Sequence, residues 1–137
     1  MEQEGKINLA EQLEYLKTMI SSLDNQISIL LKAYEEVQRA LSIIKDIELQ
    51  SSGEMKTLIG AGIYASSTLN LGQKLLVPIG SDLYIEEEKE KTATRLEKNS
   101  QEITSSLRDA QDRRSDLATR HDSIVSLVQQ QSSIKQQ

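Results

Sequence analysis

Two features of this 137-residue chain have residue types that could do chemistry: a pair of closely spaced glycines and a single histidine. Gly60-Ala61-Gly62 could let a backbone approach a phosphate, but the Lys and the Ser or Thr of a phosphate-binding loop are missing. The segment also lies between two strand-like segments, where turn chemistry already accounts for the glycines. His121 is the only histidine and cysteine is absent, so a metal site there would need carboxylates alone. We therefore expect no enzyme activity, no catalytic residue, no metal site and no cofactor.

Charge and composition exclude further classes of protein. The net charge is −5, and the densest charge run, Glu86–Lys91, is mostly acidic. A nucleic-acid-binding protein usually carries a basic patch, and this sequence has none. The N-terminal residues do not have the pattern of a secretory signal, and no apolar run approaches the length that spans a membrane. We expect a soluble cytoplasmic protein that binds neither nucleic acid nor membrane.

The elements that must position any functional surface begin with a long amphipathic helix. From Leu9 to Ile44, apolar residues recur at spacings that alternate between four and three, which is the heptad pattern of a coiled coil. Leu13, Ile20, Ile27, Tyr34 and Leu41 take the a positions, and Leu9, Leu16, Leu23, Leu30, Val37 and Ile44 take the d positions. The pattern predicts an N-terminal coiled-coil helix over residues 7–50, ended by Ser51-Ser52-Gly53.

A second amphipathic helix is predicted over residues 89–132. Leu96, Ile103, Ala110, Leu117 and Ile124 take its d positions, and the helix is nearly as long as the first. The segment between the helices is short enough for them to pair antiparallel, with Leu41 opposite Leu96 and Leu13 opposite Ile124. Three a positions are polar, namely Ser100, Arg114 and His121. They either set the register of the coiled coil or bind a ligand, and the register role is the commoner one.

The middle segment, residues 56–88, contains a repeat. Ile59-Gly60-Ala61-Gly62-Ile63-Tyr64 matches Ile79-Gly80-Ser81-Asp82-Leu83-Tyr84 twenty residues later. Each copy reads as an apolar strand, a tight turn led by Gly and a second strand, so two tandem β-hairpins are predicted. Such hairpins are not stable alone in water, and their edges need partners. The hairpin residues that we expect in an oligomer interface are Ile59, Gly60, Ile63, Tyr64, Val77, Pro78, Ile79, Gly80, Leu83 and Tyr84.

The fold class is therefore mostly α. We expect one domain over residues 1–137, formed by a long antiparallel two-helix coiled coil with two β-hairpins between the helices. Apolar residues gather where the helices end, far from the hairpins: Ile7, Leu9, Leu13, Ile124, Leu127 and Val128. We call this set the tip residues. They either complete the seam or form an apolar surface that contacts unfolded chains.

The order helix, two hairpins, helix resembles the α-class subunits of the prefoldin family, because the β class has one hairpin. Leu76-Val77-Pro78-Ile79-Gly80-Ser81-Asp82-Leu83-Tyr84-Ile85-Glu86 is similar to the hairpin motif of that family. The resemblance implies a cytosolic hexamer of two α-type and four β-type subunits, whose hairpins form a shared β-barrel. It also implies an ATP-independent chaperone that binds unfolded proteins at the coiled-coil tips and delivers them to a group II chaperonin.

Two other functions remain open. A coiled-coil scaffold or tethering protein would use the same heptads, although it has no need for paired hairpins. The regulatory or tRNA-binding arm of an enzyme is disfavoured by the acidic charge and by the missing catalytic domain.

Overall fold

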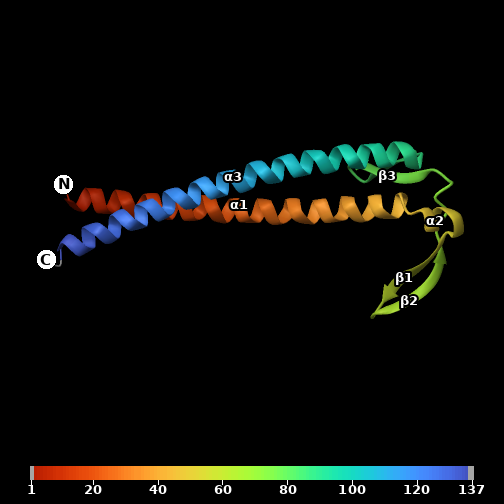
Figure 1. The fold of residues 1–137 in the computed structure, drawn as a ribbon, viewed down its shortest axis with the longest axis horizontal. Coiled ribbons are helices and arrows are strands. Elements are labelled where there is room, and N and C mark those ends of the chain that lie inside the picture. Colours follow the sequence, from red (N-terminus) through yellow and green to blue (C-terminus); the bar gives the residue numbers. More distant parts are fainter. Residues whose placement is uncertain (1, 136–137) are drawn as a thin grey trace. The chain divides into compact units, whose positions relative to one another are not determined.

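A computed structural model describes the backbone of residues 2–135 and the side chains of residues 8–46 and 49–132. The chain order is α1 (Glu2–Ile44), α2 (Ile47–Ser52), β1 (Glu54–Gly60), β2 (Ile63–Thr68), β3 (Leu75–Gly80), β4 (Leu83–Glu87) and α3 (Lys89–Lys135), which Figure 1 colours along the sequence. The fold is thus mostly helical, with two long helices flanking two antiparallel hairpins, as the sequence predicts. The contacts divide the chain into two compact units, and both long helices run through the division.

The first unit contains α1 as far as Lys32 together with α3 from Thr104 onward. The two helix segments run antiparallel, since Asp24 of α1 pairs with Arg114 of α3 and Leu16 lies beside Ile124. Leu16, Leu23 and Ala110 are buried, and they occupy d positions of the predicted heptads. The seam pattern therefore selects the residues that form this core.

The second unit extends from Ala33 to Ile103, and here α1 ends earlier than the sequence predicted. The expected single helix over residues 7–50 is wrong at its end: α1 stops at Ile44 and a separate short helix, α2, follows. Asp46 explains the break, because its Oδ1 accepts a hydrogen bond of 3.2 Å from the backbone N–H of Leu49, as a helix N-cap does. Gly53, with φ of 68°, ends α2 rather than α1.

Each hairpin closes with a two-residue turn in which both central residues have positive φ. The angles are 50° at Ala61 and 75° at Gly62 in the first turn, and 52° at Ser81 and 59° at Asp82 in the second. This left-handed geometry is the one that tight hairpins favour, because it matches the twist of the strands. β1 pairs only with β2, and β3 only with β4, so the described strands form two separate two-stranded sheets.

The hairpins are attached to the rest of the second unit by buried contacts at their bases. Leu71, between the hairpins, is buried, and Leu69 donates a backbone hydrogen bond of 2.6 Å to the carbonyl of Gly53. At the end of β4 the carboxylate of Glu87 is buried, and Nη2 of Arg95 in α3 lies 2.6 Å from its Oε2. The contact is an ion pair without an aligned hydrogen bond, because neither carboxylate oxygen has a hydrogen-bond partner among the described residues. A buried carboxylate needs such a counter-charge, so Arg95 stabilises the junction between β4 and α3.

One pair of substitutions tests the seam. Leu23 is 7% exposed and Ile29, on the same helix, is 68% exposed. Leu23→Ala should lower the free energy of unfolding by about 2–3 kcal/mol, because it removes buried methyl groups and leaves a gap. Ile29→Ala should change it by less than about 0.5 kcal/mol. Urea denaturation followed by circular dichroism measures both, and equal losses would contradict the assignment of the seam.

Candidate functional site

The two hairpins expose most of their large apolar side chains. In the registered pairs, Leu58 lies opposite Tyr64 and Pro78 lies opposite Tyr84, so each hairpin carries an aromatic next to an aliphatic or proline side chain. Ile63 and Leu83, which follow the two turns, are 57% and 60% exposed. The exposed large apolar side chains of the strands are Leu58, Ile59, Ile63, Tyr64, Leu76, Ile79, Leu83 and Tyr84. A surface of this kind marks an interaction site.

The hairpin residues predicted from the sequence lie in this surface, but they differ in exposure. Val77 is half-buried and pairs across the sheet with the half-buried Ile85, whereas Pro78 is exposed. The pairing register skips Ile59 and Ile79, so each hairpin has a bulge beside its turn. The glycines that follow these residues, Gly60 and Gly80, have φ of 134° and 110°. Leu58 and Leu76, which precede the repeated motif, were not among the interface residues predicted from the sequence. Leu76 lies in the unbroken apolar run Leu75–Ile79, which was the local signal that could have identified it.

The tip residues fall into two groups. Leu9, Leu13 and Ile124 are half-buried, whereas Leu127 and Val128 are exposed. The side chain of Ile7 lies outside the described residues. The structure therefore places an exposed apolar pair on α3 beside side chains that take part in the seam.

A groove in the first unit lies next to these residues. Its volume is about 410 Å³, and it is lined by Gln12, Tyr15 and Leu16 from α1 and by Thr119, Arg120, Ser123 and Ile124 from α3. Tyr15 is 65% exposed, and the sequence reasoning missed it because it occupies a c position outside the heptad seam. The sequence carries no signal that could have found it, because a single apolar side chain on a solvated helix face is ordinary.

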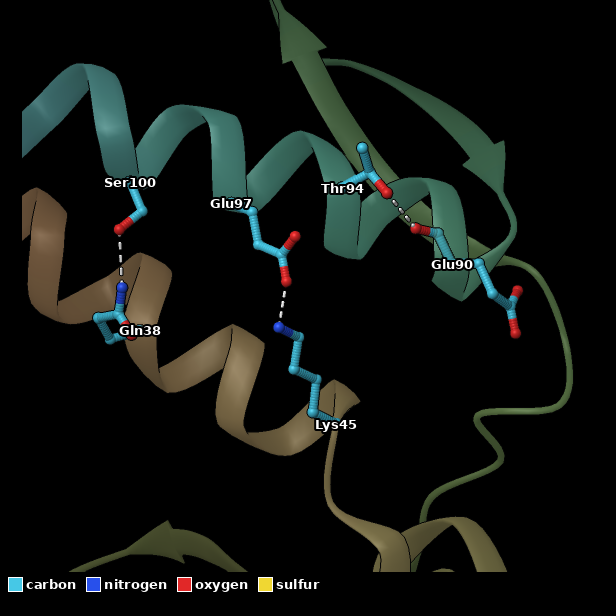
Figure 2. Close-up of polar contacts among 6 residues, drawn as sticks. All are labelled: Gln38, Lys45, Glu90, Thr94, Glu97 and Ser100. Carbon is cyan, nitrogen blue, oxygen red and sulfur yellow. Dashed lines mark hydrogen bonds and ion pairs between the residues drawn. The ribbon is translucent and has the colours of Figure 1, made fainter.

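Two of the three polar a positions, Ser100 and Arg114, contact the opposite helix, as residues that set register do. Ser100 Oγ accepts a hydrogen bond of 2.8 Å from Nε2 of Gln38, close to the Lys45–Glu97 ion pair (Figure 2). Arg114 reaches Asp24, and this hydrogen bond together with the negative charge of Asp24 raises the pKa of Arg114 above its usual value. His121 is half-buried, and its Nδ1 lies 3.6 Å from Oδ1 of Asp122.

Among the residues that the structure describes, no group of three or more His, Asp or Glu side chains could hold a metal ion. No described helix is long and apolar enough to cross a bilayer. The exposed hairpins, and the groove with its neighbouring tip residues, present apolar surfaces that can contact other chains.

Known proteins are similar to this chain in sequence and in fold. Prefoldin subunit alpha of Thermoplasma acidophilum is 37% identical over 113 residues, which cover 82% of this chain and 87% of that protein. Prefoldin subunit alpha of Picrophilus torridus is 39% identical over 99 residues, covering 72% of this chain and 70% of that protein. The cryo-EM structure of filamentous prefoldin from Methanocaldococcus jannaschii shares the fold, with a TM-score of 0.64 and 14% identity over 85% of this chain and 97% of that one.

The match to the family is also nearly complete along the chain. The model of the family described as prefoldin subunit matches residues 16–133, which include most of the seam, both hairpins and most of α3. The named relatives are α subunits, in agreement with the two hairpins of the structure. The chain belongs to the prefoldin family, as a subunit of the α class.

Proposed function

We propose that this chain is the α-type subunit of a cytoplasmic chaperone that holds unfolded polypeptides without ATP and delivers them to a group II chaperonin. In this proposal two copies assemble with four β-type subunits through a β-barrel built from their hairpins. The observation that carries the proposal is the family match over residues 16–133, together with a chain most of whose exposed large apolar side chains lie on the hairpins or near the tip.

The hairpins support the assembly part of the proposal. Two-stranded sheets have unpaired backbone groups on both edges, and isolated ones are marginal in water. The hairpins of this chain also expose apolar side chains such as Ile63 and Leu83. Pairing with strands of other subunits gives the unpaired backbone groups hydrogen-bond partners and also covers the apolar side chains.

The tip supports the holding part. Leu127 and Val128 are exposed on α3, and Tyr15 lies beside the groove. An unfolded chain presents apolar side chains in no fixed arrangement, so weak contacts at several tips suit it better than one tight pocket. Linked weak sites raise the overall affinity without any single strong contact. No nucleotide is needed for such binding.

Charges placed in the hairpins should reduce assembly. The double variant Ile63→Asp, Leu83→Asp puts two carboxylates among apolar side chains that the proposed barrel would bury, at a cost of several kcal/mol. Mixed with a β-type subunit, it should give smaller species by light scattering than the unmodified chain. Ser66→Asp with Ser81→Asp is the matched control, since it adds the same charge at exposed polar positions of the hairpins. An unchanged oligomer in the Ile63, Leu83 variant would contradict barrel assembly.

Removal of the tips should strongly weaken the binding of unfolded chains and leave assembly intact. A chain lacking residues 1–13 and 124–137 keeps both hairpins and most of the seam, so the oligomer should persist. Its suppression of the aggregation of an unfolded test protein, measured without nucleotide, should fall by about tenfold or more because each arm loses its contacts.

A milder pair of variants serves as the control. Leu127→Ser should weaken holding, whereas Leu31→Ser removes a similarly exposed leucine from α1 and should not. If the truncated oligomer protects the test protein as well as the intact one, holding must occur elsewhere on the molecule.

A further inference from the structure

The groove beside Tyr15 has a chemical character that the proposed function does not use. From Gln12 to Ile29, the g and c positions of the predicted heptads of α1 carry no charge. They are Gln12, Tyr15, Met19, Ser22, Gln26 and Ile29. Tyr15, Met19 and Ile29 are exposed large side chains on this face, although none belongs to the seam. The α1 lining of the groove, formed by Gln12, Tyr15 and Leu16, is uncharged, and this uncharged face continues along α1 beyond the groove.

The α3 lining of the groove carries one charged side chain, Arg120. Arg113 takes the preceding g position, and Asp109 and Asp116 take the c positions on the same side, so charges of both signs follow one another along this side of α3. Among the described side chains, Arg120 makes no ion pair, although Arg95 and Arg114 of the same helix each pair with a carboxylate. Asp116, one turn away on α3, does not pair with Arg120 either. In a chain of net charge −5, the groove thus carries a guanidinium that has no ion-pair partner among the described side chains.

We propose that this groove selects apolar client segments that carry an acidic residue. A large apolar side chain of the client would lie against Tyr15 and Ile124, and Arg120 would pair with the carboxylate of an Asp or Glu beside it. The groove volume of about 410 Å³ accommodates a large side chain with part of its neighbours. The inference rests on the proposed function, and it adds a preference for particular client sequences.

The charge of Arg120 supports an acidic occupant over a basic or neutral one. Complementary charge at a binding surface contributes more to specificity than to affinity, and like charges placed together are unfavourable. Guanidinium groups bind carboxylates through two parallel hydrogen bonds, which is a geometry that a lysine does not offer. Because Arg120 is exposed, the preference should be modest and should weaken with salt.

Peptide binding to the complete assembly tests the proposal. Two labelled twelve-residue peptides share a Leu-Phe centre and differ only in carrying Asp or Asn on each side of it. Acetylated and amidated ends remove the terminal charges. By fluorescence anisotropy at low salt, the Asp peptide should bind roughly two- to fivefold more tightly, as expected for an exposed ion pair. The difference should shrink as salt is raised.

Variants locate the effect. Arg120→Gln should make the two peptides bind equally, whereas Arg108→Gln, which removes an exposed arginine of α3 that does not line the groove, should keep the preference. Tyr15→Ser should weaken the binding of both peptides to the same extent. An unmodified assembly that does not distinguish the peptides would overturn the proposal, and so would an Arg108→Gln variant that loses the preference as fully as Arg120→Gln.

A parallel aggregation assay separates this inference from the function on which it rests. If the unmodified assembly protects an unfolded protein but shows no preference for the Asp peptide, the charge selection is wrong and the holding function stands. If it protects no unfolded protein, the proposed function itself fails.

Discussion

The unpaired edges of the two hairpins are the constraint on which the rest of the structure depends. A two-stranded sheet leaves a row of backbone donors and acceptors open on each side, and here it also leaves side chains such as Tyr64 and Tyr84 in solvent. The second unit holds the hairpins at their bases through the buried Leu71 and the Glu87–Arg95 ion pair, but among the described residues it does not cover the strands. Assembly with other subunits is the arrangement that satisfies both the edges and the apolar side chains.

The long helices differ from the hairpins, because they bury part of their apolar surface within this chain. Their seam is narrow, so a few buried residues such as Leu16, Leu23 and Ala110 hold the first unit together while most of the helix surface stays solvated. Polar contacts across the seam, between Gln38 and Ser100 and between Asp24 and Arg114, favour one antiparallel register over its neighbours. A thin seam also leaves large side chains such as Tyr15 and Leu127 accessible, which a thicker core would have buried.

Much of this fold could be predicted from the sequence, because heptad spacing and a repeated Gly-led turn are local signals. The pairing of Gln38 with Ser100 lies close to the register expected from those heptads. The break between α1 and α2 was missed because no Gly or Pro marks it. The heptads themselves end at Ile44, since the next a and d positions are Glu48 and Ser51, and Asp46 caps the N–H of Leu49 at the start of the next helix. The groove was missed for a different reason: Tyr15 and Arg120 lie outside the seam on separate helices, and only the antiparallel pairing brings them together.

The central claim is that the hairpins join this chain to β-type subunits of the same family. Native mass spectrometry of the purified chain mixed with a β-type prefoldin subunit tests it most directly. The account predicts a dominant complex whose mass corresponds to two copies of this chain and four of its partner, with neither protein giving that mass alone. A mixture in which the two proteins remain separate, each with the mass it has by itself, would contradict the account.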